Sequence, residues 1–177
     1  FMNIKKTANL VLNFAIKRIA EIFGIIIFVS GVLLFASLIS YSPDDPNFIF
    51  PENTQIKNLL GFQGSFISDL FFQAVGLIAY LISITFLITG INIFNSKEFF
   101  LFIENIFFVV LYAISGTLLL AHYYSDTFNI YINGNGGFVG NYLNQTFLGS
   151  LLISNEKIFY YILLLVTSIL FLISINF

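Results

Sequence analysis

Residues 58–81, NLLGFQGSFISDLFFQAVGLIAYL, decide the predicted fold of this chain. The stretch begins with spaced glycines, contains one acid and continues into a long apolar segment. Gly61 and Gly64 allow backbone conformations that other residues rarely adopt, as expected of a turn pressed against a membrane surface. Ser68 can cap a helix, and Asp69 would then lie at the positive N-terminal end of that helix. The stretch therefore predicts a water-side loop that folds into a transmembrane helix.

The helix that follows is predicted at residues 70–94, which include no charged residue. At about 1.5 Å per residue it would extend roughly 37 Å, enough to cross a hydrocarbon core of about 30 Å. Gly76, Ala79 and Ser83 fall on one stripe of this helix and are predicted to let a neighbouring helix approach closely. Three further segments have the length and composition of spans, residues 22–41, 99–121 and 158–175.

The composition excludes an ordinary water-soluble domain. Of the 177 residues, 58% are hydrophobic and only 9% are charged, whereas soluble domains carry about 25% charged residues. The absence of cysteine excludes disulfides and thiolate chemistry. The net charge of −2 gives no general attraction to nucleic acid. We therefore predict an all-α membrane protein with four transmembrane helices, short interfacial amphipathic helices and two structured outer loops.

Two domains are predicted, a basic amphipathic segment at residues 1–21 and a four-helix transmembrane domain at residues 22–177. Residues 3–20 have helical periodicity, with apolar side chains on one face and lysines and asparagines on the other. Such a helix is expected to lie in the headgroup layer on the cytosolic side. The alternative is a cytosolic extension of the first span. A cleaved signal peptide is disfavoured, because the apolar run is longer than an h-region and no A-x-A site ends it.

Basic residues predict the orientation of the spans. The N-terminal segment and the short connection at residues 95–98 carry five of them, whereas the two larger loops carry only Lys57 and Lys157. The five are Lys5, Lys6, Lys17, Arg18 and Lys97. Because basic residues concentrate on the cytoplasmic side, both chain ends and the 95–98 connection are predicted inside and both larger loops outside.

The first outer loop begins with Ser-Pro-Asp-Asp-Pro at residues 42–46. Pro43 and Pro46 disfavour helical conformations, so the first span has to end here. Asp44 and Asp45 supply turn-forming side chains. A carboxylate pair can also bind a divalent cation, but such a cation prefers about six oxygens, so a turn is the favoured interpretation.

The second outer loop contains a glycine-rich run at residues 133–140. It is not a phosphate loop, because the lysine and Ser/Thr that would follow are missing. The semi-apolar residues 142–153 suit a short helix lying on the membrane surface. We predict that the glycine-rich run packs with residues 42–46 and 61–69 as a compact cap over the helix ends.

Three classes of function remain for such a chain. A transporter or channel usually has ionisable residues or broken helices at mid-membrane, and the predicted spans lack central charges and proline. An enzyme needs a nucleophile, base or metal set, which one histidine and scattered acids do not supply. We therefore expect a structural anchor, with no catalytic, cofactor-binding or metal site; a small four-helix transporter or channel subunit is the alternative.

Three short motifs follow one another in a fixed relation to the four spans. They are Tyr41-Ser42-Pro43-Asp44-Asp45-Pro46 after the first span, Asn58, Gly61, Gly64, Asp69-Leu70-Phe71, Gly76 and Ala79-Tyr80 at the second, and Gly136-Gly137-Phe138-Val139-Gly140 before the last. Together with both ends inside, this order resembles the N-terminal membrane domain of FtsK/SpoIIIE-type DNA translocases over about residues 17–177.

The resemblance implies an anchor at the division septum of the bacterial inner membrane. In that family this domain holds a cytosolic hexameric motor, which moves chromosomal DNA during segregation with ATP and Mg²⁺. This chain contains no Gly-x-x-x-x-Gly-Lys-Ser/Thr motif, so the motor is absent from it. The implied partners are membrane lipids, further copies of the chain in a hexamer, and other cell-division proteins; direct nucleic-acid binding is not expected.

Overall fold

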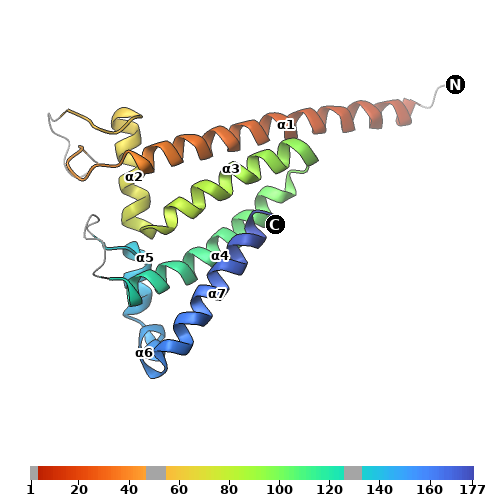
Figure 1. Ribbon diagram of the computed structural model, residues 1–177. Helices are drawn as coiled ribbons and strands as arrows, with labels where there is room; N and C mark the ends of the chain where they lie inside the picture. Colours follow the sequence, from red (N-terminus) through yellow and green to blue (C-terminus); the bar gives the residue numbers. More distant parts are fainter. Residues whose placement is uncertain (1–3, 47–54, 126–132) are drawn as a thin grey trace.

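The computed structural model describes residues 4–46, 55–125 and 133–177. Within these ranges the protein is all helical (Figure 1). The long helices are α1 (Ile4–Ile39), α3 (Ile78–Ser96), α4 (Phe100–Tyr123) and α7 (Glu156–Ser174). The short helices are α2 (Gly61–Val75), α5 (Gly137–Asn144) and α6 (Phe147–Ser154). The four long helices are long and apolar enough to cross a membrane, which confirms the predicted fold class.

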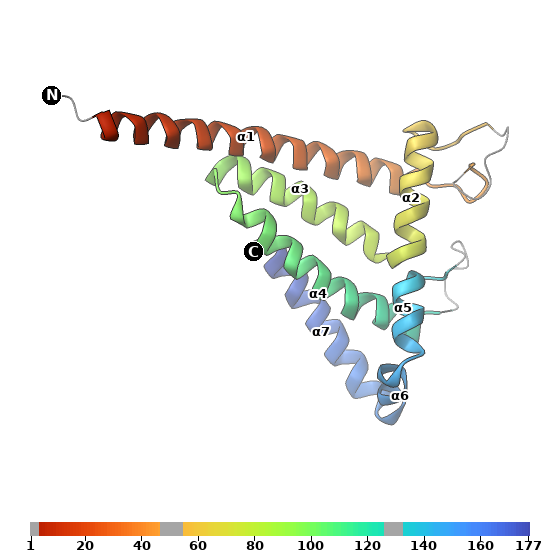
Figure 2. The same cartoon turned by 180° about the vertical axis from the view of Figure 1, so that it is seen from behind.

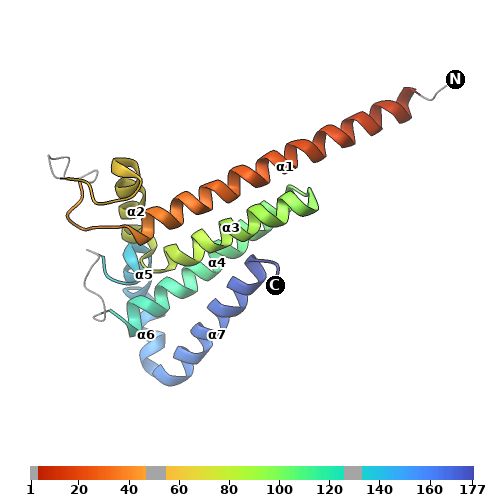
Figure 3. The same cartoon turned by 45° about the horizontal axis from the view of Figure 1, so that its top comes forward.

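The four long helices lie side by side in chain order, as an open fan (Figures 1 and 2). α1 packs on α3, α3 on α4, and α4 on α7. The three short helices lie across the end of the molecule where the long helices are farthest apart. There α2 contacts α5, and α5 contacts α6. The chain termini and the α3–α4 turn lie at the opposite end of the long helices from α2, α5 and α6 (Figure 3).

The N-terminal segment is not a separate helix. α1 runs unbroken from Ile4 to Ile39, so the predicted boundary at residue 21 does not coincide with a break. No proline or glycine interrupts the chain before Gly24, and an uninterrupted apolar and basic sequence continues the helix. The N-terminal part of α1 extends beyond the end of α3 (Figure 1). This arrangement corresponds to the alternative in which the segment extends the first span.

The prediction of one helix over residues 70–94 is wrong. α2 ends at Val75, and α3 begins at Ile78 after a sharp turn at Gly76 (φ 59°, ψ −140°). The Leu77 N–H donates to the Asn135 carbonyl at 2.9 Å, and a Cβ at Gly76 would overlap that carbonyl. A contact with a distant loop therefore breaks the apolar run, so that α2 crosses the helix ends and α3 spans.

The start of α2 also differs from the prediction. The helix begins at Gly61, and Ser68 lies inside it rather than at its cap. The Ser68 hydroxyl donates to the carbonyl of Gly64 at 2.8 Å within the same helix. The glycines and the acid of this stretch thus belong to a short helix across the ends of the spans.

The surface helix predicted at residues 142–153 is two helices. α5 ends at Asn144, and Thr146 caps α6 by accepting from the Leu148 N–H at 3.3 Å. A Cβ at Gly149 would overlap the Asn144 carbonyl, so the two helices meet closely at this turn. The predictions for the third and fourth spans agree with α4 and α7 to within a few residues.

Glycines set the contact between α1 and α3. The buried positions of α1 recur every three or four residues and are Ala20, Gly24, Ile27, Gly31, Leu34, Ser37 and Leu38. A Cβ at Gly24 would lie 2.7 Å from the Phe94 backbone nitrogen, and one at Gly31 would lie 2.7 Å from that of Leu87. The two backbones therefore touch directly, the packing that small residues permit between spans.

Candidate functional site: a hydrogen-bonded cap over the helix ends

The cap comprises α2, α5 and α6 with residues 41–46, 55–60 and 133–136. Its first junction is organised by Asp45, a residue that is only 4% exposed. One carboxylate oxygen accepts the Lys57 N–H at 2.8 Å and the other accepts the Asn58 N–H at 2.8 Å. Hydrogen bonds from backbone donors to a buried carboxylate are charge-assisted and strong. Asp45 thus fastens the chain that leaves α1 to the chain that enters α2.

Asn58 continues the first junction into the end of α1. Its amide donates to the Ser37 carbonyl at 2.9 Å, and its side-chain oxygen accepts the Leu60 N–H at 3.1 Å. The Leu59 N–H donates to the Ser40 hydroxyl at 3.1 Å. Carbonyls in the last turn of a helix have no partner within the helix, and Asn58 supplies one here.

Asp69 and Tyr41 complete the first junction from the other side. The Tyr41 hydroxyl donates to the Asp69 carboxylate at 3.1 Å, and the Tyr41 ring lies 5.0 Å from that of Phe72. The Ser65 hydroxyl donates to the Pro46 carbonyl at 3.0 Å. The motif at residues 41–46, after the first span, therefore contacts the motif that begins at Asn58 and continues through α2.

The two aspartates of residues 44–45 have different surroundings. The Asp44 side chain is 78% exposed and pairs with Lys57 Nζ at 2.8 Å. The hydrogen bond and charge of Lys57 hold the pKa of Asp44 below its usual value, and Asp44 in turn raises the pKa of Lys57. Among the described residues, no group of three or more potential ligands could hold a metal ion.

The second junction is built from glycines. A Cβ at Gly76 would overlap the Asn135 carbonyl, and one at Gly137 would lie 2.6 Å from the Gly76 nitrogen. Gly136 and Gly140 press in the same way on the Thr117 carbonyl and on Ala121 of α4. Backbone against backbone at these positions leaves no room for a side chain.

Side chains around the second junction tie it to α2 and α4. The Asn133 amide donates to the Gln73 side-chain oxygen at 2.8 Å, and the Asn141 amide donates to the Asn133 carbonyl at 2.7 Å. His122 Nδ1 lies 2.7 Å from the Asn144 side-chain oxygen. This hydrogen bond links the end of α4 to α5 of the cap.

Several predicted residues lie outside these junctions. Gly61 has a positive φ of 65°, but a Cβ there would meet nothing within 4 Å. Pro43 is exposed at the turn. Ala79 and Ser83 are fully buried on α3, whereas Gly76 is at the turn and does not share their helical stripe. Residues 47–54 and 126–132 of the two predicted loops lie outside the described part of the chain.

Sequence reasoning missed a polar network between α3, α4 and α7. Thr85 Oγ1 lies 3.0 Å from the Tyr112 hydroxyl and 3.1 Å from the Ser174 hydroxyl. The Asn105 amide donates to Thr89 at 2.8 Å and to the Asn176 side-chain oxygen at 3.0 Å. Near the cap, Thr167 donates to Ser115 at 2.9 Å. The recurrence of Thr85, Thr89 and Asn92 at helical spacing was the available signal.

Comparison with known proteins matches this chain to a membrane region. A family profile described as the 4TM region of DNA translocase FtsK/SpoIIIE matches residues 16–177. The chain is 34% identical over 96 residues to the DNA translocase FtsK of Rickettsia typhi, covering 54% of this chain and 13% of that protein. It is 29% identical over 110 residues to the DNA translocase FtsK of Azospirillum brasilense, covering 61% of this chain and 17% of that protein. No solved structure matches.

Proposed function

The chain belongs to the family of the 4TM region of DNA translocase FtsK/SpoIIIE, and from this premise we propose that it is the membrane-anchoring and assembly domain of such a translocase. In this role it tethers a cytosolic, ATP-driven, hexameric DNA pump at the division septum for chromosome segregation. The observation that carries the proposal is the extent of the match, which includes all four spans and the whole described cap. The matched part spans about one eighth of the Rickettsia typhi relative, so the pump itself would lie in sequence beyond the matched region.

The chemistry of the described residues supports a structural role. The acids and amides of the cap bond to backbone groups and to one another, as Asp45 and Asn58 do. The fully buried polar side chains between the spans are neutral hydroxyls and amides. We propose that this chain is not itself an enzyme and holds no cofactor, and that ATP and Mg²⁺ act at the motor. A transporter or channel function has no specific observation in its favour.

We propose that the chain lies in the bacterial inner membrane. The cap would lie outside the cytoplasm, and both described ends of the chain would lie inside it. The excess of lysine and arginine at the N-terminus and near Lys97 supports it. Single-cysteine labelling suits this cysteine-free chain. A membrane-impermeant maleimide added to spheroplasts should label D44C, in the cap, and spare E98C, at the α3–α4 turn. The reverse pattern would overturn the orientation.

A domain exchange tests the anchoring role. In the full-length gene product, residues 1–177 are replaced by an unrelated four-helix membrane domain of the same orientation. Septal fluorescence of a tagged motor should disappear, while ATP hydrolysis by the purified motor persists. Septal localisation of the exchanged protein would contradict the proposal. Residues 1–177 fused to a fluorescent protein should concentrate at the septum, and an even distribution around the cell would also contradict it.

The proposed partners follow from the same role. The lipids of the membrane contact the exposed apolar faces of the spans, whose large side chains are numerous on α1 and α7. Copies of the chain and other cell-division proteins would meet at the spans and at the cap. Direct contact with nucleic acid is not proposed for this chain, because its net charge is −2.

A further inference from the structure

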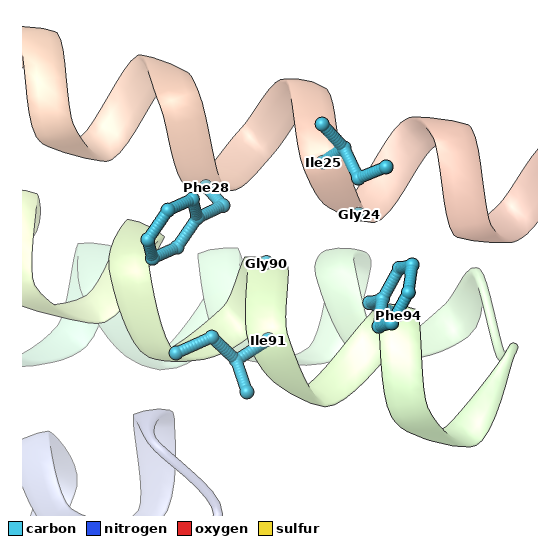
Figure 4. Close-up of a pocket in the computed structure, with 6 residues that line it drawn as sticks. All are labelled: Gly24, Ile25, Phe28, Gly90, Ile91 and Phe94. Atoms are coloured by element: carbon cyan, nitrogen blue, oxygen red, sulfur yellow. The ribbon is translucent and has the colours of Figure 1, made fainter.

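An apolar groove lies on the surface of the α1–α3 pair, toward the end that carries the N-terminus. It has a volume of about 290 Å³ and is lined by Gly24, Ile25, Phe28, Gly90, Ile91 and Phe94. Figure 4 shows Gly24 and Gly90 facing each other, with Phe28 and Phe94 on either side of them. Because the glycines have no side chain, the crossing point forms the floor and the neighbouring side chains form the walls.

The backbone forms the floor of the groove. A Cβ at Gly24 would lie 2.7 Å from the Phe94 nitrogen and 2.8 Å from the Gly90 carbonyl oxygen. The floor is therefore backbone packed against backbone. The wall residues remain open to the surroundings, with Ile25 50%, Ile91 46% and Phe94 45% exposed. An open apolar groove on a membrane-spanning helix pair faces acyl chains.

A charged cluster of Arg18, Glu21 and Lys97 lies next to the groove. Arg18 precedes Gly24 by six residues, nearly two helical turns. Glu21 precedes Gly24 by one turn, and Lys97 follows Phe94 by one turn. Glu21 accepts from Arg18 at 2.6 Å and from Lys97 at 2.9 Å. Two cations share one carboxylate, and their side chains remain 57% and 37% exposed. The cluster therefore carries a net positive charge and still offers donors to an anion.

We propose that the groove and this cluster form a binding site for one anionic glycerophospholipid. One acyl chain lies in the groove along Gly24 and Gly90, and the phosphate contacts Arg18 and Lys97. The charge decides the choice of ligand, because lipid tails alone are as apolar as the groove and confer little selectivity. The site rests on the membrane location of the helices and is independent of the proposed septal role.

The expected preference follows from the excess charge. A basic residue near an anionic membrane surface contributes about 1 kcal/mol, or roughly fivefold in binding. The uncompensated cation of the cluster should therefore favour an anionic over a zwitterionic phospholipid by about fivefold. Arg18 also offers a planar set of donors that matches phosphate oxygens.

Tryptophan fluorescence gives a direct test, because the chain contains no tryptophan. Ile91→Trp places a probe on the groove wall, and Ile169→Trp on α7 is the matched control. Ile91 is 46% exposed and Ile169 is 47% exposed, and each precedes the last residue of its helix by the same number of residues. Both full chains are reconstituted in phosphatidylcholine vesicles with a minority of phosphatidylglycerol.

Bromination of the acyl chains of one lipid at a time then reports which lipid lies beside each probe. Brominated phosphatidylglycerol should quench the probe at position 91 with about fivefold higher apparent affinity than the probe at 169. Brominated phosphatidylcholine should quench both alike. Equal quenching of both probes by phosphatidylglycerol would overturn the proposal, as would a probe at 91 that neither lipid quenches.

A charge variant separates the headgroup contact from simple exposure. In the Ile91→Trp chain, the pair Arg18→Gln and Lys97→Asn should remove the preference for phosphatidylglycerol, and asparagine suits the left-handed backbone of Lys97 (φ 63°). Lys157→Gln, a cation lost at the other end of the spans, should leave the preference intact. A preference that survives the double substitution would overturn the proposal. The same double substitution is also made in the Ile169→Trp chain. Unchanged quenching of that probe shows that the fold is retained.

Discussion

The two junctions of the cap reach the same result by different physical means. The first relies on side chains, since Asp45 bonds the N–H groups of Lys57 and Asn58 and Asn58 bonds the Ser37 carbonyl. The second relies on the absence of side chains, since Gly76 and Gly137 bring backbone directly onto backbone. A junction of hydrogen bonds should weaken by steps when a bond is removed. A junction of glycines should fail at once when a Cβ is added.

The largest effect is therefore expected at Gly76. Gly76→Leu adds a side chain where even a Cβ would overlap the Asn135 carbonyl, at a φ of 59°. The expected loss of stability exceeds about 4 kcal/mol, the range reserved for severe steric conflicts. The purified variant should aggregate or elute as a broad peak from size-exclusion chromatography in detergent.

Gly61 provides the control for that substitution. Its φ of 65° is similar, but a Cβ there would meet nothing within 4 Å. Gly61→Leu should cost only the left-handed backbone strain, about 1–2 kcal/mol. If both variants lost the same stability, the second junction would owe nothing to close packing.

A smaller effect is expected when Asp45 of the first junction is replaced. Asp45→Ala leaves the N–H groups of Lys57 and Asn58 without their carboxylate partner. The Asn58 N–H is buried, and a buried unsatisfied group costs about 1–3 kcal/mol of stability. The thermal midpoint in detergent should fall clearly while the elution peak stays sharp. Asp44→Ala, one residue away and exposed, is the matched control. A similar fall for both would show that Asp45 acts by charge rather than by bonding the backbone.

The break at Gly76 illustrates what could be predicted from the sequence. Composition and the lengths of the apolar runs sufficed for the all-α class and for the number of spans, because a helix that crosses the hydrocarbon core needs about 20 mostly apolar residues. The break depends on Asn135, far along the chain, and an apolar run with one glycine is compatible with a continuous span. The spacing of Gly76 from Ala79 and Ser83 therefore predicts a helical stripe, although Gly76 forms a turn.

The cap was only partly predictable. Prolines and aspartates at residues 43–46 indicated a turn, and the structure places Asp45 inside a junction and Asp44 outside it. Nothing in the sequence distinguishes the two carboxylates, since their roles are set by the backbone groups of Lys57 and Asn58. The start of α2 at Gly61, rather than at Ser68, likewise depends on contacts made only in the folded chain, so the sequence did not predict it.

The polar network between the spans should contribute less than either junction. Thr85→Val removes the hydroxyl that bonds Tyr112 and Ser174 and keeps the shape of the side chain. Hydrogen bonds between spans average about 0.6 kcal/mol, so about 1 kcal/mol is expected in a thermal-stability assay. Ser168→Ala, whose hydroxyl bonds only within α7 among the described residues, should have almost no effect. A loss for Thr85→Val as large as for Asp45→Ala would contradict this order.

The smallest effect belongs to the exposed pair of Asp44 and Lys57. Lys57 lowers the pKa of Asp44, so this pair stabilises the fold above the usual pKa of aspartate, and its contribution disappears as the pH falls through the lowered value. At the alkaline end it disappears as the pH rises through the raised pKa of Lys57. The difference in thermal midpoint between the natural chain and Asp44→Asn should be small, constant near neutral pH, and reduced by salt. A difference that grows on acidification would contradict the assignment.

Amide hydrogen exchange in lipid nanodiscs tests most directly whether the cap is one ordered unit. The N–H groups of Lys57, Asn58 and Leu77 lie outside regular helix hydrogen bonding and are protected only by the two junctions, through Asp45 and the Asn135 carbonyl. All three should exchange as slowly as the hydrogen-bonded amides within α3. Exchange at the rate of an exposed loop would contradict an ordered cap and leave the domain as four helices joined by loose connections.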